Sequence, residues 1–241
     1  MSDIFDPNSA ARADSGIFGL SCAEEDSALV YLPVPWEAPT SYGGGTSRAP
    51  AAILKASRQV DLFDSDVLRP YAPGLHMLAQ SPRVRRWNRA AMIDARRVIA
   101  AGGETKGRPR LAAAARRVNA LGDKLNAFVR DESERLFSAG KIVGLVGGDH
   151  SVPFGAIEVV ARRFPGLGIL HFDAHLDARD AFEGFTWSHA SIMRNVLARI
   201  PGVARLVQVG IRDFCEEELD FCSGQSERVK IYFDRDLSSR R

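Results

Sequence analysis

Two short clusters of ionisable residues have the composition of a metal site. The first is Gly147–Ser151 (GGDHS) and the second is Asp173–Asp177 (DAHLD). Asp173, His175 and Asp177 are spaced i, i+2, i+4, so in an extended segment their side chains would share one face. Carboxylate oxygens mixed with imidazole nitrogens suit Mn²⁺, Fe²⁺, Zn²⁺ or Co²⁺, and manganese tolerates the oxygen-rich version best. Carboxylates can also bridge two ions about 3.5–4 Å apart, as in two-metal hydrolases.

The first cluster contributes a further nitrogen ligand. We expect His150 to bind from a loop next to the second cluster, and Gly147 and Gly148 to permit the tight turn that directs it. Together the clusters predict one half of a binuclear site in a hydrolase.

Buried parallel strands must position these loops. The apolar runs Lys141–Val146 and Gly166–Phe172 flank a segment with helical spacing, a pattern typical of parallel strands covered on both faces. In such sheets, ligand residues gather beyond the carboxyl ends of the strands, where both clusters lie.

The remaining pattern predicts one α/β domain over residues 1–241, with an irregular leader at 1–26. A glycine-rich loop, Gly43–Gly45, follows the first predicted strand, but no phosphate-binding fingerprint accompanies it. Further strands are expected at Ala28–Val34, Gln59–Phe63, Ala204–Val209 and Val229–Phe233, and helices at 51–57, 84–100, 111–138 and 191–199.

Composition excludes several classes of protein. The chain has 32 basic and 30 acidic residues and no aromatic platform near its arginine clusters, so we expect solvated helix faces and no nucleic-acid partner. No apolar run reaches the ~20 residues that cross a bilayer, and the polar start has no signal-peptide core. Three widely spaced cysteines, Cys22, Cys215 and Cys222, favour reduced thiols in a cytoplasmic protein.

GGDHS and HFDAHLD resemble two of the three signatures of the ureohydrolase family, which includes arginases and agmatinases. The resemblance extends to YGGGTSRAPAAIL near the N-terminus and to VQVGIRD after the second cluster. It implies a three-layer αβα fold with a mainly parallel sheet. It also implies a hydrolase of guanidino C–N bonds that holds two Mn²⁺ ions and releases urea through a metal-bridging hydroxide.

The resemblance also implies roles for individual residues. His150 and Asp177 would bind one ion, His175 the other, and Asp173 would bridge them. His189, in Phe185-Thr186-Trp187-Ser188-His189, corresponds to the family's proton-shuttle histidine, and a pKa near neutrality suits proton delivery to a leaving amine. Glu218 lies near a position that contacts the far end of the substrate. A hydrogen-bonded loop histidine is the alternative for His189.

The third family signature, SxDxDxxDP, is absent from this sequence. Asp234 and Asp236 form a D-x-D after a strand, but they lack the flanking residues and lie too early in the chain, so we interpret them as unrelated. Asp173 and Asp177 would offset only two of the four positive charges of two divalent ions. We therefore expect weak or single-metal occupancy and little turnover.

The absent signature also has a structural consequence. The family's strand order resembles 2-1-3-8-7-4-5-6, so this chain would lack the two central strands. A gap of about 14 Å would then separate strands 3 and 4, at ~4.8 Å per strand, unless those strands pair directly. We expect an incomplete sheet, in a truncated member of the family.

Several functions remain open at this point. Agmatinase-like activity is favoured slightly over arginase activity, and formiminoglutamate and guanidinobutyrate are alternative substrates. The chain would act on a small guanidino substrate, with no membrane partner, and would form a homo-oligomer if complete. A catalytically inactive remnant that binds metal or a partner chain is the alternative from another class, and an arginase-like deacetylase is more distant.

Overall fold

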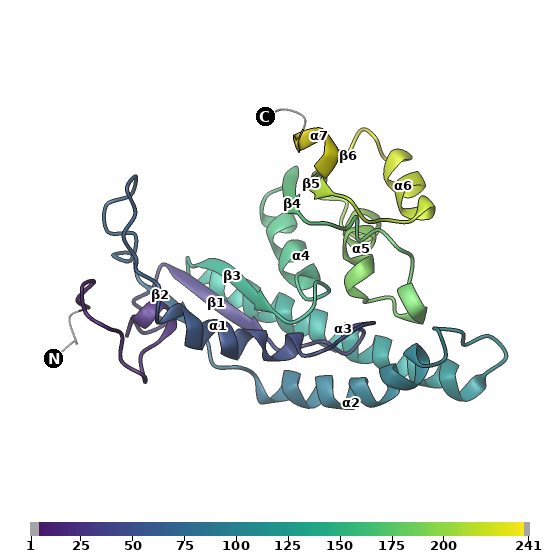
Figure 1. Cartoon of the computed structure of the whole chain (residues 1–241), viewed down its shortest axis with the longest axis horizontal. Coiled ribbons are helices and arrows are strands. Elements are labelled where there is room, and N and C mark those ends of the chain that lie inside the picture. The colour runs from purple at the N-terminus through teal and green to yellow at the C-terminus, as the bar shows by residue number, and fades with distance from the viewer. Residues whose placement is uncertain (1–4, 239–241) are drawn as a thin grey trace.

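The computed structural model describes residues 5–238 and shows an α/β protein with two separate parallel sheets (Figure 1). The strands are β1 (Leu29–Val34), β2 (Leu75–Met77), β3 (Ile142–Gly147), β4 (Leu167–Phe172), β5 (Val203–Ile211) and β6 (Val229–Phe233). The α-helices are α1 (Ala49–Ser57), α2 (Pro82–Ile99), α3 (Pro109–Ser138), α4 (Phe154–Arg163), α5 (Ile192–Arg199), α6 (Glu216–Ser223) and α7 (Asp234–Ser238). No helix in the described part is long and apolar enough to span a membrane.

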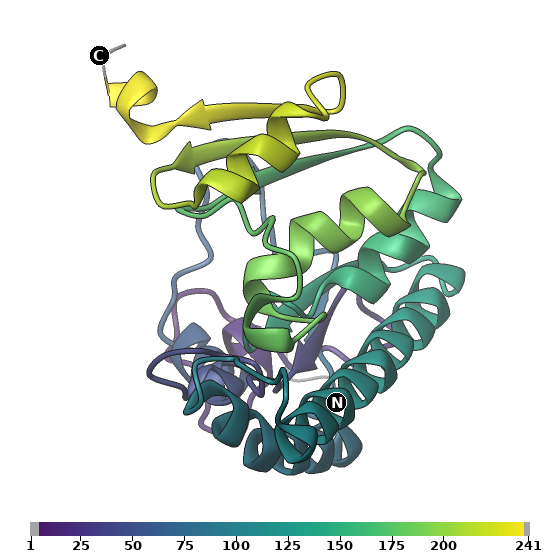
Figure 2. The same ribbon diagram turned by 90° about the vertical axis from the view of Figure 1, so that its right-hand side faces the viewer.

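The two sheets have the orders β2-β1-β3 and β4-β5-β6, and all their pairings are parallel. Helices α2 and α3 lie together along the first sheet, and α4 and α5 cover one face of the second (Figures 1 and 2). Each sheet has its own core. Val34 of β1 packs in a cluster with Val84, Val98 and Val129 of α2 and α3, and Leu206 of β5 packs with residues of α4 and α5.

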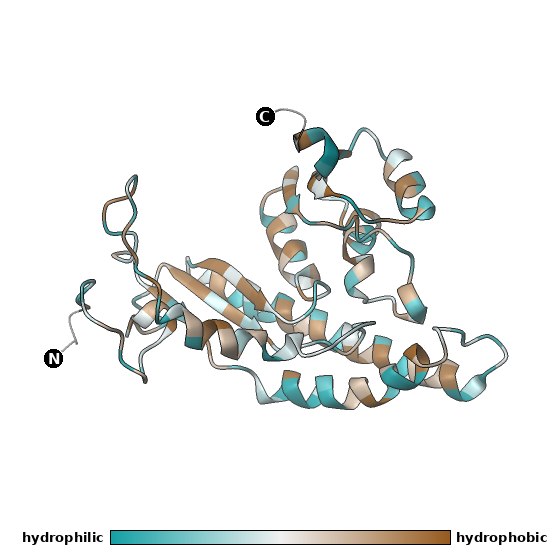
Figure 3. Ribbon diagram, in the orientation of Figure 1, coloured by the Kyte–Doolittle hydropathy of each residue, from teal (hydrophilic) through white to brown (hydrophobic). Residues whose placement is uncertain are grey.

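Helix α2 shows why these segments become amphipathic helices. Its buried positions, Val84, Asn88, Ala91, Ala95 and Val98, recur every three or four residues and so form one face. The arginines of the helix are exposed, and much of its ribbon has the hydrophilic colour in Figure 3. Pro82 opens the helix at a position where its missing N–H costs nothing.

One predicted strand is wrong. Gln59–Phe63 is irregular, with Val60 54% and Phe63 87% exposed, so these apolar side chains find no core to face. The edge of β1 is occupied instead by Leu75–Met77, which lies outside every strand predicted from the sequence. The other predicted strands are confirmed within about two residues at each end. Of the predicted leader, residues 1–4 lie outside the described range, and the rest is irregular apart from turns and a short 3₁₀ helix at Ile17–Gly19.

Strands β3 and β4 do not pair with each other in the described structure, so the β3 edge of the first sheet and the β4 edge of the second are open. Ile142 of β3 and Leu170 and Phe172 of β4 are more than 60% exposed. Of the two arrangements considered from sequence, direct pairing or open interior edges, the structure has the second. That the chain lacks two central strands of the family's sheet stays a prediction.

The long helices α2 and α3 are joined by a two-bond ion pair that gives a pH-dependent prediction. Arg117 donates to both carboxylate oxygens of Asp94 at 2.7 and 2.8 Å, and this hydrogen bonding lowers the pKa of Asp94. A lowered folded-state pKa stabilises the fold above the unfolded pKa and loses that contribution as pH falls. Asp94→Asn should therefore lower the denaturation midpoint modestly at pH 7, and the difference from wild type should vanish near pH 2. A difference that is constant with pH would contradict this.

Candidate metal centre

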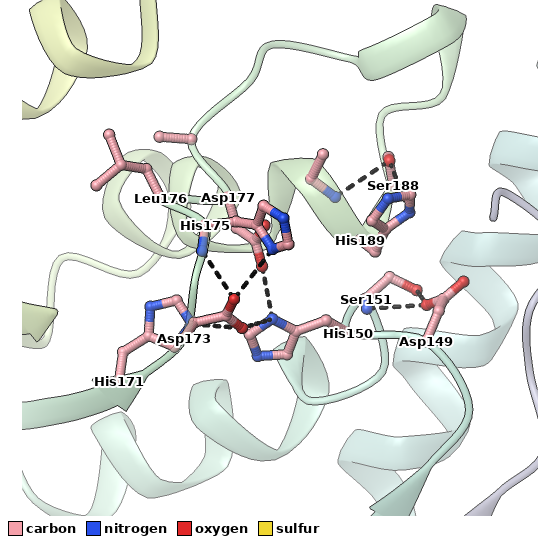
Figure 4. A network of polar contacts seen from close by, with 12 residues as sticks. Asp149, His150, Ser151, His171, Asp173, His175, Leu176, Asp177, Ser188 and His189 are labelled. Atoms are coloured by element: carbon pink, nitrogen blue, oxygen red, sulfur yellow. Dashed lines mark hydrogen bonds and ion pairs between the residues drawn. The ribbon is translucent and has the colours of Figure 1, made fainter. Parts of the chain in front are cut away.

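The two predicted clusters meet at one point, where β3 and β4 end (Figure 4). His150 Nδ1 lies 2.6 Å from Asp177 Oδ2 and 3.5 Å from Asp173 Oδ2. Ligand atoms of His150, His171, Asp173 and Asp177 all lie within 4.8 Å of one another. A set of two imidazoles and two carboxylates at this spacing fits a divalent transition metal.

Asp173 lies between His150 and His175. Its Oδ2 faces His150, and its Oδ1 accepts from the backbone N–H of His175 at 2.9 Å and lies 3.1 Å from Nδ1 of the same residue. A carboxylate with one oxygen toward each histidine has the orientation that a bridging ligand requires.

The side chain of His175 is exposed to solvent. It is 56% exposed, and Nε2 lies 3.7 Å from the exposed carboxylate of Asp213. His175 contacts Asp173 and lines one cavity with Asp177, although Asp177 adopts a left-handed conformation with φ of 53° that ends the extended segment. Aspartate is among the few residues that tolerate this conformation. The turn carries Asp177 into the interior beside His150.

Backbone contacts fix the loop that carries Asp177. Its carbonyl oxygen accepts from Met193 N at 3.0 Å and Arg194 N at 3.3 Å, so it satisfies free N–H groups in the first turn of α5. The next residue, Ala178, donates its N–H to Glu218 Oε1 at 3.0 Å, and Cys215 donates to Oε2 of the same carboxylate at 3.0 Å. Buried Glu218 thus joins the Asp177 loop to the start of α6.

The GGDHS loop is fixed by close backbone contacts with the segment after β1. Gly148 N donates to Val34 O at 3.0 Å and Asp149 N donates to Trp36 O at 2.9 Å. The side chain of Asp149 turns away from the cluster of His150, His171, Asp173 and Asp177, here called the metal cluster. It accepts hydrogen bonds from the backbone N–H of Ser151 and the hydroxyl of Thr40. Burial raises the pKa of Asp149, against the opposing effect of those hydrogen bonds and of His189.

Electrostatics in the centre couple the histidines to the carboxylates. Burial alone would lower the pKa of His150, but Asp177, Asp173 and Asp149 outweigh it and raise that pKa. Burial alone would raise the pKa of Asp173, but His171, the N–H of His175 and the charge of His150 outweigh it and hold that pKa well below its usual range. A metal ion would have to displace the proton from His150, so binding should release protons.

A cavity of about 240 Å³ opens beside the metal cluster. Its lining includes His189, His175 and Asp177, and Glu218 forms part of its wall. Its lining residues are Ser41, His175, Asp177, Arg179, Phe182, His189, Ala190, Asp213, Phe214 and Glu218. Ser41 belongs to the segment just before the glycine-rich loop Gly43–Gly45.

Sequence reasoning missed His171. It is 5% exposed and lies two residues before Asp173, with Nε2 3.3 Å from Asp173 Oδ2. The alternation of a strand places residues 171 and 173 on one face. Extending the i, i+2 spacing of Asp173 and His175 back by two residues would therefore have identified His171.

Comparison with known proteins identifies the family of the chain. The sequence model of the Arginase family matches residues 27–241, and the chain belongs to that family. It is 29% identical over 214 residues to N(1)-aminopropylagmatine ureohydrolase of Synechocystis sp., an alignment that covers 88% of this chain and 59% of that protein. It is 44% identical to mitochondrial arginase 1 of Oryza sativa subsp. indica over 122 residues, which cover 49% of this chain and 35% of that protein.

Solved structures show the same fold. Agmatine ureohydrolase of Thermoplasma volcanium superposes with a TM-score of 0.64 at 20% identity, covering 98% of this chain and 64% of that one. The chain therefore spans about three-fifths of the length of these relatives.

Proposed function

We propose that this chain acts as a metal-dependent ureohydrolase on a small guanidino compound, with agmatinase-like substrates favoured over arginine. The observation that supports it most is the convergence of His150, Asp173 and Asp177, whose ligand atoms come from two loops distant in sequence. The naming of several relatives as agmatine or aminopropylagmatine ureohydrolases supports the substrate preference.

In this proposal His150 and Asp177 would hold one Mn²⁺ ion together with Asp173, and in the complete family site His175 would hold a second ion, to which Asp173 would also contribute. The two oxygens of Asp173 face these two sides, which supports the assignment. When bound, the metal supplies a water of lowered pKa and neutralises developing negative charge. The residues of the chain hold the ions, orient the guanidinium group beside them and deliver a proton to the leaving amine.

His189 is the proposed proton donor. It lines the cavity with Asp177 and His175, while Ser188 Oγ lies 3.5 Å from its Nδ1. Glu218 is the proposed contact for the cationic far end of the substrate, because it is an acidic residue of the same wall, where its Oε2 already lies 3.4 Å from Arg179 Nε. Both of its oxygens also accept backbone N–H groups, so it positions the loops as well.

Replacing His189 by glutamine tests the shuttle. The variant should release urea about 10²-fold more slowly, the lower range for loss of a general acid, because the cavity keeps its shape but loses the imidazole that would deliver the proton. Mn²⁺ affinity should be unchanged, since His189 lies outside the four-residue cluster. Equal loss of metal affinity and rate would place His189 among the ligands instead.

Urea release from a panel of guanidino compounds tests the function itself. Agmatine, N(1)-aminopropylagmatine, arginine, guanidinobutyrate and formiminoglutamate, which is assayed by formamide release, should be compared with and without Mn²⁺. We expect slow, Mn²⁺-dependent turnover that is largest with agmatine or its aminopropyl derivative, and none with Asp177→Asn. Turnover that ignores Mn²⁺ would overturn the proposal.

A second candidate is a chain that binds metal without appreciable turnover. It is favoured by the charge of the cluster, because the four grouped residues in the described structure include only two carboxylates. Metal binding with no hydrolysis of any compound in the panel would support this candidate. The expectations of a cytoplasmic location, and of a homo-oligomer if the chain is complete, belong to the ureohydrolase proposal and not to this second candidate.

A further inference from the structure

His171 and Gln208 form a buried polar pair behind the metal centre. They face each other across neighbouring strands, in register between β4 and β5. His171 is 5% and Gln208 0% exposed, so neither side chain can exchange its partners for water. In such a site the hydrogen-bonding capacity of each atom determines what its neighbours must be.

A backbone carbonyl fixes the orientation of the Gln208 amide. Its Nε2 donates to Leu176 O at 2.8 Å, and the opposite orientation would place two acceptor oxygens against each other. The same Nε2 lies 3.1 Å from His171 Nδ1. Since that nitrogen carries two N–H groups and accepts nothing, Nδ1 of a neutral His171 must be the acceptor.

The proton of neutral His171 therefore sits on Nε2. That atom lies 3.3 Å from Asp173 Oδ2, within contact distance although not aligned as a hydrogen bond, and it has no other partner in the described structure. To bind a metal ion through Nε2, a neutral His171 would have to move its proton to Nδ1, where it would face the N–H of Gln208. With the proton on Nε2, this atom can instead hold a carboxylate in place. Membership of the four-residue cluster alone left both roles open.

We propose that His171, with its tautomer fixed by Gln208, is a positioning residue that directs Asp173 Oδ2 toward the metal centre and does not bind metal itself. Gln208 also holds Leu176, next to Asp177, so the pair supports both carboxylates from behind. Groups of this kind typically contribute 10–100-fold to metal affinity. The role in metal binding rests on the proposed function, whereas the tautomer does not.

Imidazole ¹⁵N NMR of the metal-free full chain tests the tautomer without metal or substrate. We expect His171 to be protonated at Nε2 and its Nε2–H signal to shift in Asp173→Asn. Gln208→Met, which keeps the volume but removes the donor, should lose the tautomer preference. A His171 protonated at Nδ1 in the wild-type chain would overturn the proposal, whatever the chain does with Mn²⁺. Should Gln208→Met not fold, the wild-type spectrum and Asp173→Asn decide this point.

Mn²⁺ titration of two His171 variants tests the positioning role. A glutamine amide can place an N–H near the position of Nε2, so His171→Gln should recover most of the affinity lost in His171→Leu, which we expect to be about 10–100-fold. Equal losses in the two variants would show that His171 is a ligand and overturn the proposal, and so would an unchanged affinity in His171→Leu. Absence of Mn²⁺ binding by the wild type would instead count against the proposed function, with the NMR result deciding the tautomer.

Discussion

Replacing Gly148 by alanine is expected to destabilise the chain by about 3 kcal/mol or more and to abolish metal binding. A Cβ at this position would lie 1.7 Å from Trp36 O and 2.7 Å from Trp36 C. Both are backbone atoms, and Trp36 O already accepts the N–H of Asp149, so the neighbouring segment cannot move aside without breaking that contact. The displaced loop is the one that carries His150.

Gly168→Ala is the matched control. Gly168 lies in β4, and the nearest atom to its added Cβ would be the Cβ of Arg205 at 3.9 Å, an ordinary contact. We expect a stability change within about 1 kcal/mol, because alanine also lowers the entropy of the unfolded chain. Urea denaturation measures both variants, and equal stability of the two would show that the close approach at Gly148 does not determine the fold of the loop.

Asp177→Asn is expected to keep the fold and to lose more than about 100-fold in Mn²⁺ affinity. Asparagine has nearly the same shape and also tolerates φ near 53°, so the turn at this position should survive. The substitution removes one of the two carboxylates of the cluster and the partner of His150 Nδ1. Loss of a direct ligand should exceed the 10–100-fold effect of an outer partner.

Asp213→Asn makes the same chemical change at the rim. Asp213 is 80% exposed and lies 3.7 Å from His175, so its charge is screened by solvent and we expect little change in affinity. Isothermal titration with Mn²⁺ compares the two variants. Equal effects would mean that the general negative charge of the cavity, rather than the geometry around His150, holds the ion.

Much of the site could be predicted from the sequence, because its ligands follow regular strands. The apolar runs before GGDHS and DAHLD identify β3 and β4, and the carboxyl ends of parallel strands gather ligands. The wrong strand at Gln59–Phe63 shows the limit of such patterns: its alternation suits a strand, but the edge of β1 pairs with Leu75–Met77.

Two features of the site required the structure itself. The left-handed turn at Asp177 depends on contacts with the N-terminus of α5, which follows only fifteen residues later but folds back onto the loop. The pairing of His171 with Gln208 depends on the register of two strands, which a single sequence does not specify. Spacing thus indicates which residues can meet, and tertiary contacts determine which atoms do.

Metal content tests the central claim most directly. The full chain and Asp177→Asn would be loaded with Mn²⁺, dialysed and assayed for ions per chain. With two carboxylates in the cluster against the four positive charges of two ions, we predict at most one ion, weakly held, in the wild-type chain and none in the variant. Two tightly held ions per wild-type chain, or an unchanged metal content in Asp177→Asn, would contradict it.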